Sequence, residues 1–66
     1  MKQIKSLEEL RDYINSNEDW MLEVNEVIVA NDWTDETGEK YGICNDGKNR
    51  LQFDGEMNAE IVELGL

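Results

Sequence analysis

The fold is decided by residues 40–53, which read KYGICNDGKNRLQF. Two runs within this stretch, 40–44 and 50–53, alternate between apolar and polar side chains in the manner of half-buried strands. Asn45-Asp46-Gly47-Lys48 joins them, and Asp-Gly between alternating runs is a strong hairpin signal because glycine takes a positive φ at little cost. The stretch therefore predicts two antiparallel strands, with one face carrying Tyr41, Ile43, Leu51 and Phe53.

The residues that follow predict a third strand. Asp54-Gly55-Glu56 marks a turn, and residues 59–64 alternate again, although a short helix also fits them. Ala59 and Ile61 fall on one face of this strand, and Val62 and Leu64 fall on the other. A meander of three strands is stable by itself only when something packs on its apolar face.

The segment before the hairpin begins with a helix. Ser6-Leu7-Glu8-Glu9 is a capping box, in which the Ser6 hydroxyl accepts from the Glu9 amide and the Glu9 carboxylate reaches back. Leu7, Leu10 and Ile14 recur at helical spacing behind it. We expect a helix from Leu7 to Asn15.

Residues 20–31 are compatible with a helix or a strand. An apolar arc at 100° per residue, together with a second capping box at Ser16-Asn17-Glu18-Asp19, favours a helix. The β-branched side chains favour a strand, which would need a bulge near Asn25-Glu26. The arc consists of Trp20, Met21, Val24, Val27 and Ile28. The whole pattern predicts a single α+β domain over residues 1–66, with one or two N-terminal helices packed on a three-stranded antiparallel β-meander.

The composition excludes several ways of stabilising so short a chain. A domain of 66 residues buries only about 60% of its unfolded surface. Cys44 is the only cysteine and there is no histidine, so an internal disulfide and the usual zinc sites are excluded. The unpaired cysteine fits a reducing compartment, and no run of residues resembles a signal peptide or a membrane span. We therefore expect a cytoplasmic protein.

The net charge of -10 constrains the partner. It disfavours direct binding to nucleic acid or to an anionic membrane, and it favours cationic partners. Eight acidic residues and no Lys or Arg lie between Asn17 and Glu39. Trp33 lies among them, either as a cap on the core or as an exposed aromatic anchor. The predicted partner-binding residues are Glu18, Asp19, Glu23, Glu26, Asp32, Trp33, Asp35, Glu36 and Glu39.

The favoured function is a non-enzymatic module that docks on a basic, nucleic-acid-handling protein, with carboxylates in the places meant for phosphates. Small acidic domains of this kind are typical of phage and mobile elements. No catalytic group, cofactor site or metal site is predicted. Cys44 has no histidine to activate it, the glycines are isolated at turns, and a pocket of about 300 Å³ is not expected in so short a chain.

Three alternatives remain open at this stage. The carboxylates can form a solvated face that keeps the protein soluble. The polar loop 31–39 is rich in oxygen ligands, so a calcium-responsive domain is an alternative, although the spacing is not that of an EF-hand. A homodimer is the third, in which Leu22, Val29 and the tail 64–66 are buried against a second copy.

Overall fold

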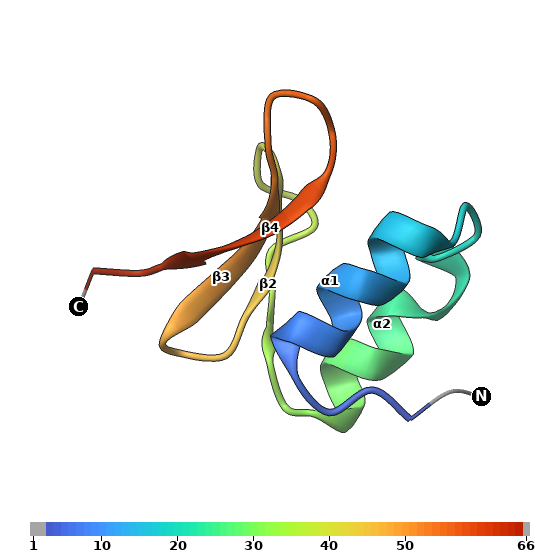
Figure 1. The fold of residues 1–66 in the computed structure, drawn as a ribbon. Coiled ribbons are helices and arrows are strands. Elements are labelled where there is room, and N and C mark those ends of the chain that lie inside the picture. Colours follow the sequence, from blue (N-terminus) through green and yellow to red (C-terminus); the bar gives the residue numbers. More distant parts are fainter. Residues whose placement is uncertain (1–2, 66) are drawn as a thin grey trace.

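The computed structural model describes residues 3–65, and these form two helices followed by a sheet. The elements are α1 (Leu7–Ser16), α2 (Met21–Ala30), β1 (Thr34–Asp35), β2 (Gly42–Asn45), β3 (Asn49–Phe53) and β4 (Ala59–Glu63). Neighbouring strands are antiparallel and their order is β1-β2-β3-β4. Both helices lie on one side of the sheet (Figure 1). The predicted α+β architecture is confirmed, with one strand more than expected.

The additional strand, β1, lies in the segment that was predicted to be a polar loop. Thr34 pairs with Asn45 and Asp35 pairs with Cys44. The Glu36 amide extends this pairing by donating to the Ile43 carbonyl at 2.8 Å. A strand of two residues carries no detectable alternation, so periodicity could not reveal it.

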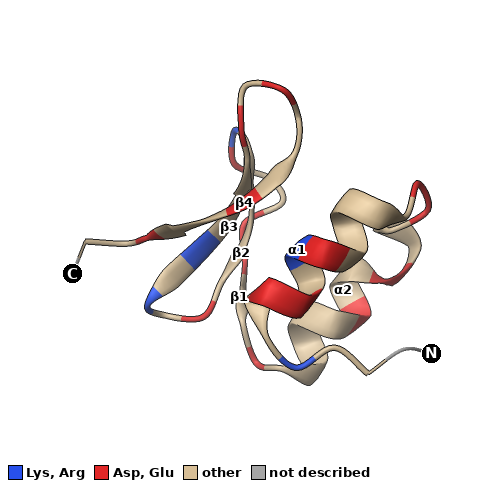
Figure 2. Cartoon of the chain, viewed as in Figure 1, with Lys and Arg blue, Asp and Glu red and all other residues tan. Residues whose placement is uncertain are grey.

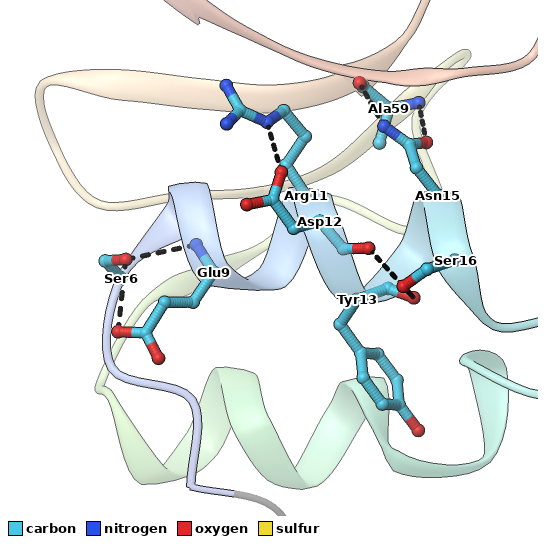
Figure 3. Close-up of polar contacts among 8 residues, drawn as sticks. All are labelled: Ser6, Glu9, Arg11, Asp12, Tyr13, Asn15, Ser16 and Ala59. Atoms are coloured by element: carbon cyan, nitrogen blue, oxygen red, sulfur yellow. Dashed lines mark hydrogen bonds and ion pairs between the residues drawn. The ribbon is translucent and has the colours of Figure 1, made fainter.

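The first helix begins as its capping box predicts. The Ser6 Oγ accepts from the Glu9 amide at 3.1 Å, as Figure 3 shows. The return contact differs in detail, because the Ser6 hydroxyl itself donates to the Glu9 carboxylate at 3.4 Å. Leu7, Leu10 and Ile14 are buried, and the helix continues one residue beyond the predicted end.

Residues 21–30 form the second helix, which settles the choice that the sequence left open. Val24, Val27 and Ile28 are buried as the helical arc requires, and Trp20 is half-buried. Met21 was placed on the same arc, but 70% of it is exposed. This residue is the first of α2 and lies at the edge of the arc, beyond the buried core.

The second capping box is not formed. The Ser16 hydroxyl donates to the Asp12 carbonyl at 2.6 Å, within the last turn of α1. Because α1 continues through Ser16, this hydroxyl is not free to cap α2. The residue at the N-cap of α2 is Trp20, which makes no side-chain capping bond.

A side-chain amide joins the helices to the sheet. The Asn15 Nδ2 donates to the Ala59 carbonyl at 3.1 Å, and the Ala59 amide donates to the Asn15 Oδ1 at 2.8 Å (Figure 3). This pair fixes the end of α1 against the start of β4. The core between the layers includes Leu10, Ile43, Cys44 and Leu51, which are all but inaccessible to solvent.

The predicted sheet face is confirmed except at Tyr41. Ile43 and Leu51 are buried beneath the helices and Phe53 packs against the same core. Tyr41 is 53% exposed, and its φ is 66°. The strand register also shifts between Gly42 and Cys44. A left-handed residue followed by a bulge interrupts the alternation on which the prediction relied.

Candidate functional site

The nine residues predicted to bind a partner lie in two groups and not on one surface. One group lies on α2 and on the two turns that flank it, and the other lies on β1 and the loop that leads to β2. Acidic positions are found on both layers of the molecule (Figure 2). The helical group is Glu18, Asp19, Glu23, Glu26 and Asp32, and the sheet group is Asp35, Glu36 and Glu39. Trp33 lies between the groups.

Arg50 neutralises two members of the sheet group. Its Nε lies 2.8 Å from the Glu36 carboxylate, and its Nη2 lies 3.0 Å from the Glu39 carboxylate. The Asn45 amide donates a further hydrogen bond to Glu36 at 2.6 Å. A Cβ at Gly42 would collide with the Arg50 guanidinium, so this glycine leaves the space that the ion pairs occupy.

This ion-paired cluster lies on the face of the sheet that is turned away from the helices. Arg50 pairs with Asn45 and Val62 across the sheet, one position from the buried Leu51. Successive side chains of a strand point to opposite faces. The Glu36 side chain is therefore held on the far side of the sheet from α2, where only 14% of it remains exposed.

Asp35 also has a structural contact. Its Oδ1 accepts a hydrogen bond from the Thr37 amide at 2.9 Å, which is an Asx turn. The hydrogen bonds from Thr37 hold the pKa of Asp35 below its ordinary value. Together with the Arg50 contacts, this means that three carboxylates of the oxygen-rich loop already have partners within the chain.

Glu23 is the one member of the helical group with a side-chain partner. The Tyr13 hydroxyl donates to the Glu23 carboxylate at 3.1 Å, and the Tyr13 ring points toward α2 (Figure 3). Burial and the Glu23 carboxylate both raise the pKa of Tyr13. This bond joins α1 to α2 and assigns Glu23 a structural role.

The other four members of the helical group have no such contact. Glu18, Asp19, Glu26 and Asp32 are exposed, and within residues 3–65 none of them forms an ion pair or a side-chain hydrogen bond. In Figure 2 the turn before α2 and α2 itself carry acidic and uncharged positions but no basic ones. These four side chains form the candidate binding surface, together with Leu22 and Val29 between them.

Trp33 is half-buried and packs against the core. Its amide donates to the Ile28 carbonyl at 3.0 Å, which holds the chain against the end of α2. This arrangement supports the interpretation of Trp33 as a cap on the core. A role for its indole edge in binding stays a prediction.

Two surface grooves are larger than the sequence led us to expect. One has a volume of 530 Å³ and lies between the start of α2 and the sheet, where Trp20 and Phe53 contact each other. The other has a volume of 510 Å³ and lies beside Ile4 and Ala30. The expectation of little room for a pocket was wrong, because α2 packs incompletely against the sheet at its start and against the N-terminal segment at its end. Sequence reasoning missed the exposure of Tyr41 and Met57, since both depend on a left-handed backbone conformation.

Cys44 does not have the chemistry of a nucleophile. Burial raises the pKa of its thiol to about 12, and the negative charge of Glu36 adds to the effect. The thiol is therefore protonated at neutral pH, whereas the thiolate is the reactive form. Within residues 3–65, no group of three or more acidic or cysteine side chains is arranged to hold a metal ion.

In the part of the chain that the structure describes, neither helix is long and apolar enough to cross a membrane. A scan against protein-family models, a search of curated proteins and a search of solved structures each found no match for this chain.

Proposed function

We propose that this chain is a non-enzymatic protein-binding module that docks on a basic protein surface through α2 and its flanking turns. In the specific form of the proposal, the partner is a nucleic-acid-handling protein of the cytoplasm. The carboxylates then take positions that phosphates occupy when nucleic acid binds. A buried, unpaired Cys44 is compatible with such a reducing compartment.

The observation that carries this proposal is the set of unpaired carboxylates on the helical layer. Glu18, Asp19, Glu26 and Asp32 are exposed and make no polar side-chain contact within residues 3–65. Like charges held close together repel one another and do not stabilise the fold. A cationic partner relieves that repulsion and is attracted to the surface before contact.

Exposed apolar side chains on the same helix support a protein partner over a small cation. Leu22 and Val29 are 80% and 79% exposed. Helical spacing places Leu22, Glu26 and Val29 on one side of α2. A protein interface combines apolar area with a polar rim, and this surface offers both.

Charge reversal with a matched control tests the proposal. The variant Glu18→Lys/Glu26→Lys and the control Glu8→Lys/Glu63→Lys each change the net charge from -10 to about -6. All four side chains are exposed and make no ion pair within residues 3–65. Each protein is immobilised and used to capture basic proteins from a cell extract at about 50 and about 200 mM salt.

We expect the unmodified chain and the control to retain a basic protein at the lower salt concentration and to release it at the higher one. Added duplex DNA should release the same protein. The α2 variant should capture at least tenfold less. Equal capture by the variant and the control would show that net charge alone is responsible, and would refute a binding role for α2.

Self-association is the second candidate, and the exposure of Leu22 and Val29 is the observation that favours it. The tail that was grouped with them is less informative, because Leu64 is half-buried and Leu66 lies outside the described residues. Sedimentation over a wide range of concentration separates the candidates. A strict monomer at high concentration would exclude a homodimer.

A further inference from the structure

The groove between the start of α2 and the sheet has an apolar lining that the proposed function does not use. Its volume is 530 Å³. Trp20 and Phe53 lie against each other beside it, with ring centres 5.6 Å apart and ring planes tilted by 54°. Side chains that line the groove include Trp20, Met21, Val24, Ile43, Phe53 and Met57.

Two methionines on this lining are largely exposed. Met21 on α2 is 70% exposed, and Met57 in the turn between β3 and β4 is 61% exposed. Methionine side chains are flexible and polarisable, and they are frequent on surfaces that accommodate apolar side chains of varied shape. The groove therefore combines adjustable edges with aromatic side chains that are partly fixed by the core.

The backbone holds Met57 in a conformation that favours glycine. Its φ is 65°, in the left-handed region. The turn contains Gly55, but this glycine does not take the left-handed position. The Asp54 carboxylate fixes the turn by accepting from the amides of Glu56 at 2.8 Å and Asn58 at 3.0 Å. A rigid turn thus presents a large apolar side chain where glycine would cost less.

Tyr41 repeats this feature beside the adjoining hollow. Its φ is 66° and its side chain is 53% exposed. Non-glycine residues in the left-handed region are found more often at functional sites than elsewhere. The ring of Tyr41 makes a cation–π contact, because the Lys40 ammonium lies 5.0 Å from the centre of the ring.

The charges around the groove favour a cationic occupant. The adjoining hollow shares Phe53 and Met57 with the groove and is also lined by Asp54 and Glu60. Within the described residues, no Lys or Arg lines either hollow, and Lys40 lies beside the second one, over the ring of Tyr41. A second copy of the chain carries the same net charge of -10 and would be repelled.

We propose that this groove binds an apolar side chain of a cationic, amphipathic segment in the partner protein. The apolar side chain packs between Met21 and Met57, and the flanking Lys or Arg side chains lie against Asp54 and Glu60. This inference rests on the proposed function, because it takes the cationic partner from there. It adds a second contact, at one end of the surface formed by α2.

Two synthetic peptides of about twelve residues test the inference. One alternates Lys with Leu at helical spacing, and the other has Ser in place of each Leu, so that the two have equal charge. Binding is followed by tryptophan fluorescence and by the NMR shifts of the methionine methyl groups. We expect the Lys/Leu peptide to bind at least tenfold more tightly and to shift the methyl signals of Met21 and Met57.

The variant Met57→Gly removes the side chain from the groove. The glycine that replaces it adopts the left-handed backbone conformation at little cost. Its thermal midpoint should be unchanged or higher, which separates lost binding from lost folding. It should bind the Lys/Leu peptide at least tenfold more weakly and the Lys/Ser peptide as before. Val62→Thr is the matched control, because Val62 is an exposed apolar residue of the sheet half that lines neither hollow.

Four outcomes would overturn the inference. Equal binding of the two peptides would show that charge alone attracts them, and no effect of Met57→Gly would show that the Leu side chains bind outside the groove. The proposed function would then stand if the reversal at Glu18 and Glu26 still abolished capture. No binding of either peptide would reject the groove as a peptide site. A dimer that Met57→Gly dissociates would show that a second copy occupies the groove.

Discussion

The helical half and the sheet half of this protein carry the same number of acidic residues and use them differently. Residues 3–33 and residues 34–65 contain eight Asp and Glu side chains each. In the sheet half, Asp35, Asp46 and Asp54 accept backbone amides at turns, and Arg50 binds two glutamates. In the helical half, five of the eight make no polar side-chain contact within residues 3–65. Charge density in the sequence therefore does not show which carboxylates stabilise the fold.

The difference follows from the local backbone. Turns leave amides without partners, and a short Asp side chain reaches them. A helix satisfies its own amides except in the first turn, so Glu26 within α2 has no amide to bind. The sheet also brings Arg50 beside carboxylates that are distant in the chain. Glu26 on α2 is therefore left without a partner, and Glu18, Asp19 and Asp32 on the flanking turns also make no side-chain contact within residues 3–65.

The largest expected effect is on the labelling rate of the Cys44 thiol. This rate reports how readily the sheet half opens to solvent. Its pKa is raised from 9.0 to about 12, so the thiolate fraction at pH 8 should be roughly a thousandfold lower than in the unfolded chain. Iodoacetamide labelling followed by mass spectrometry measures this, with the denatured protein as the control. Labelling of the folded protein within tenfold of the denatured rate would show that the sheet half opens readily.

The second prediction compares two ion pairs. Arg50→Met leaves the half-buried Glu36 without its cation and should lower the free energy of unfolding by about 2 kcal/mol. Arg11→Met breaks only the exposed pair with Asp12 and should cost less than about 0.5 kcal/mol. Urea unfolding followed by tryptophan fluorescence measures both. Equal losses of stability in the two variants would show that the half-buried ion pair stabilises the fold no more than the exposed one does.

The third prediction uses pH to identify a carboxylate that stabilises the sheet half. Backbone amides of Asn49 and Lys48 hold the pKa of Asp46 below its ordinary value. Because the pKa of Asp46 is lower in the folded chain, its contribution to stability is complete above the pKa of the unfolded chain. This contribution is lost as the pH falls through the pKa of the folded chain. Asp46→Ala should therefore cost less than about 1 kcal/mol at neutral pH, because solvent screens this exposed carboxylate, and the difference from the unmodified chain should shrink toward pH 2. A loss that is the same at both pH values would show that the charge is not responsible.

The smallest effect is expected on α2. Glu26→Gln removes a charge that makes no contact within residues 3–65, so the free energy of unfolding should change by less than about 0.5 kcal/mol. Glu36→Gln is the matched sheet-side variant and should cost about 1–2 kcal/mol, because it weakens the bond to Arg50. Urea unfolding at low and high salt measures both. If Glu26→Gln were the more damaging variant, α2 would depend on its carboxylates after all.

The sequence by itself determined the features that depend on neighbours within a few residues. The capping bond at Ser6, the hairpin turn around Gly47 and the strand from Ala59 were all predictable, because each arises from local backbone preference and periodicity. Where two local signals competed, as for Ser16, the sequence could not tell which helix the side chain would serve. The competition was decided by where α1 ends.

Only the tertiary structure decided which charges have partners and which apolar side chains remain exposed. Glu36 and Glu39 meet Arg50 because β1, β2 and β3 pair in one register, and no spacing rule links residues 14 and 11 positions apart. The exposure of Met57 likewise depends on a left-handed backbone in a turn between strands. Long-range pairing fixes such contacts, and it is set by how the two layers pack, not by any short segment of the chain.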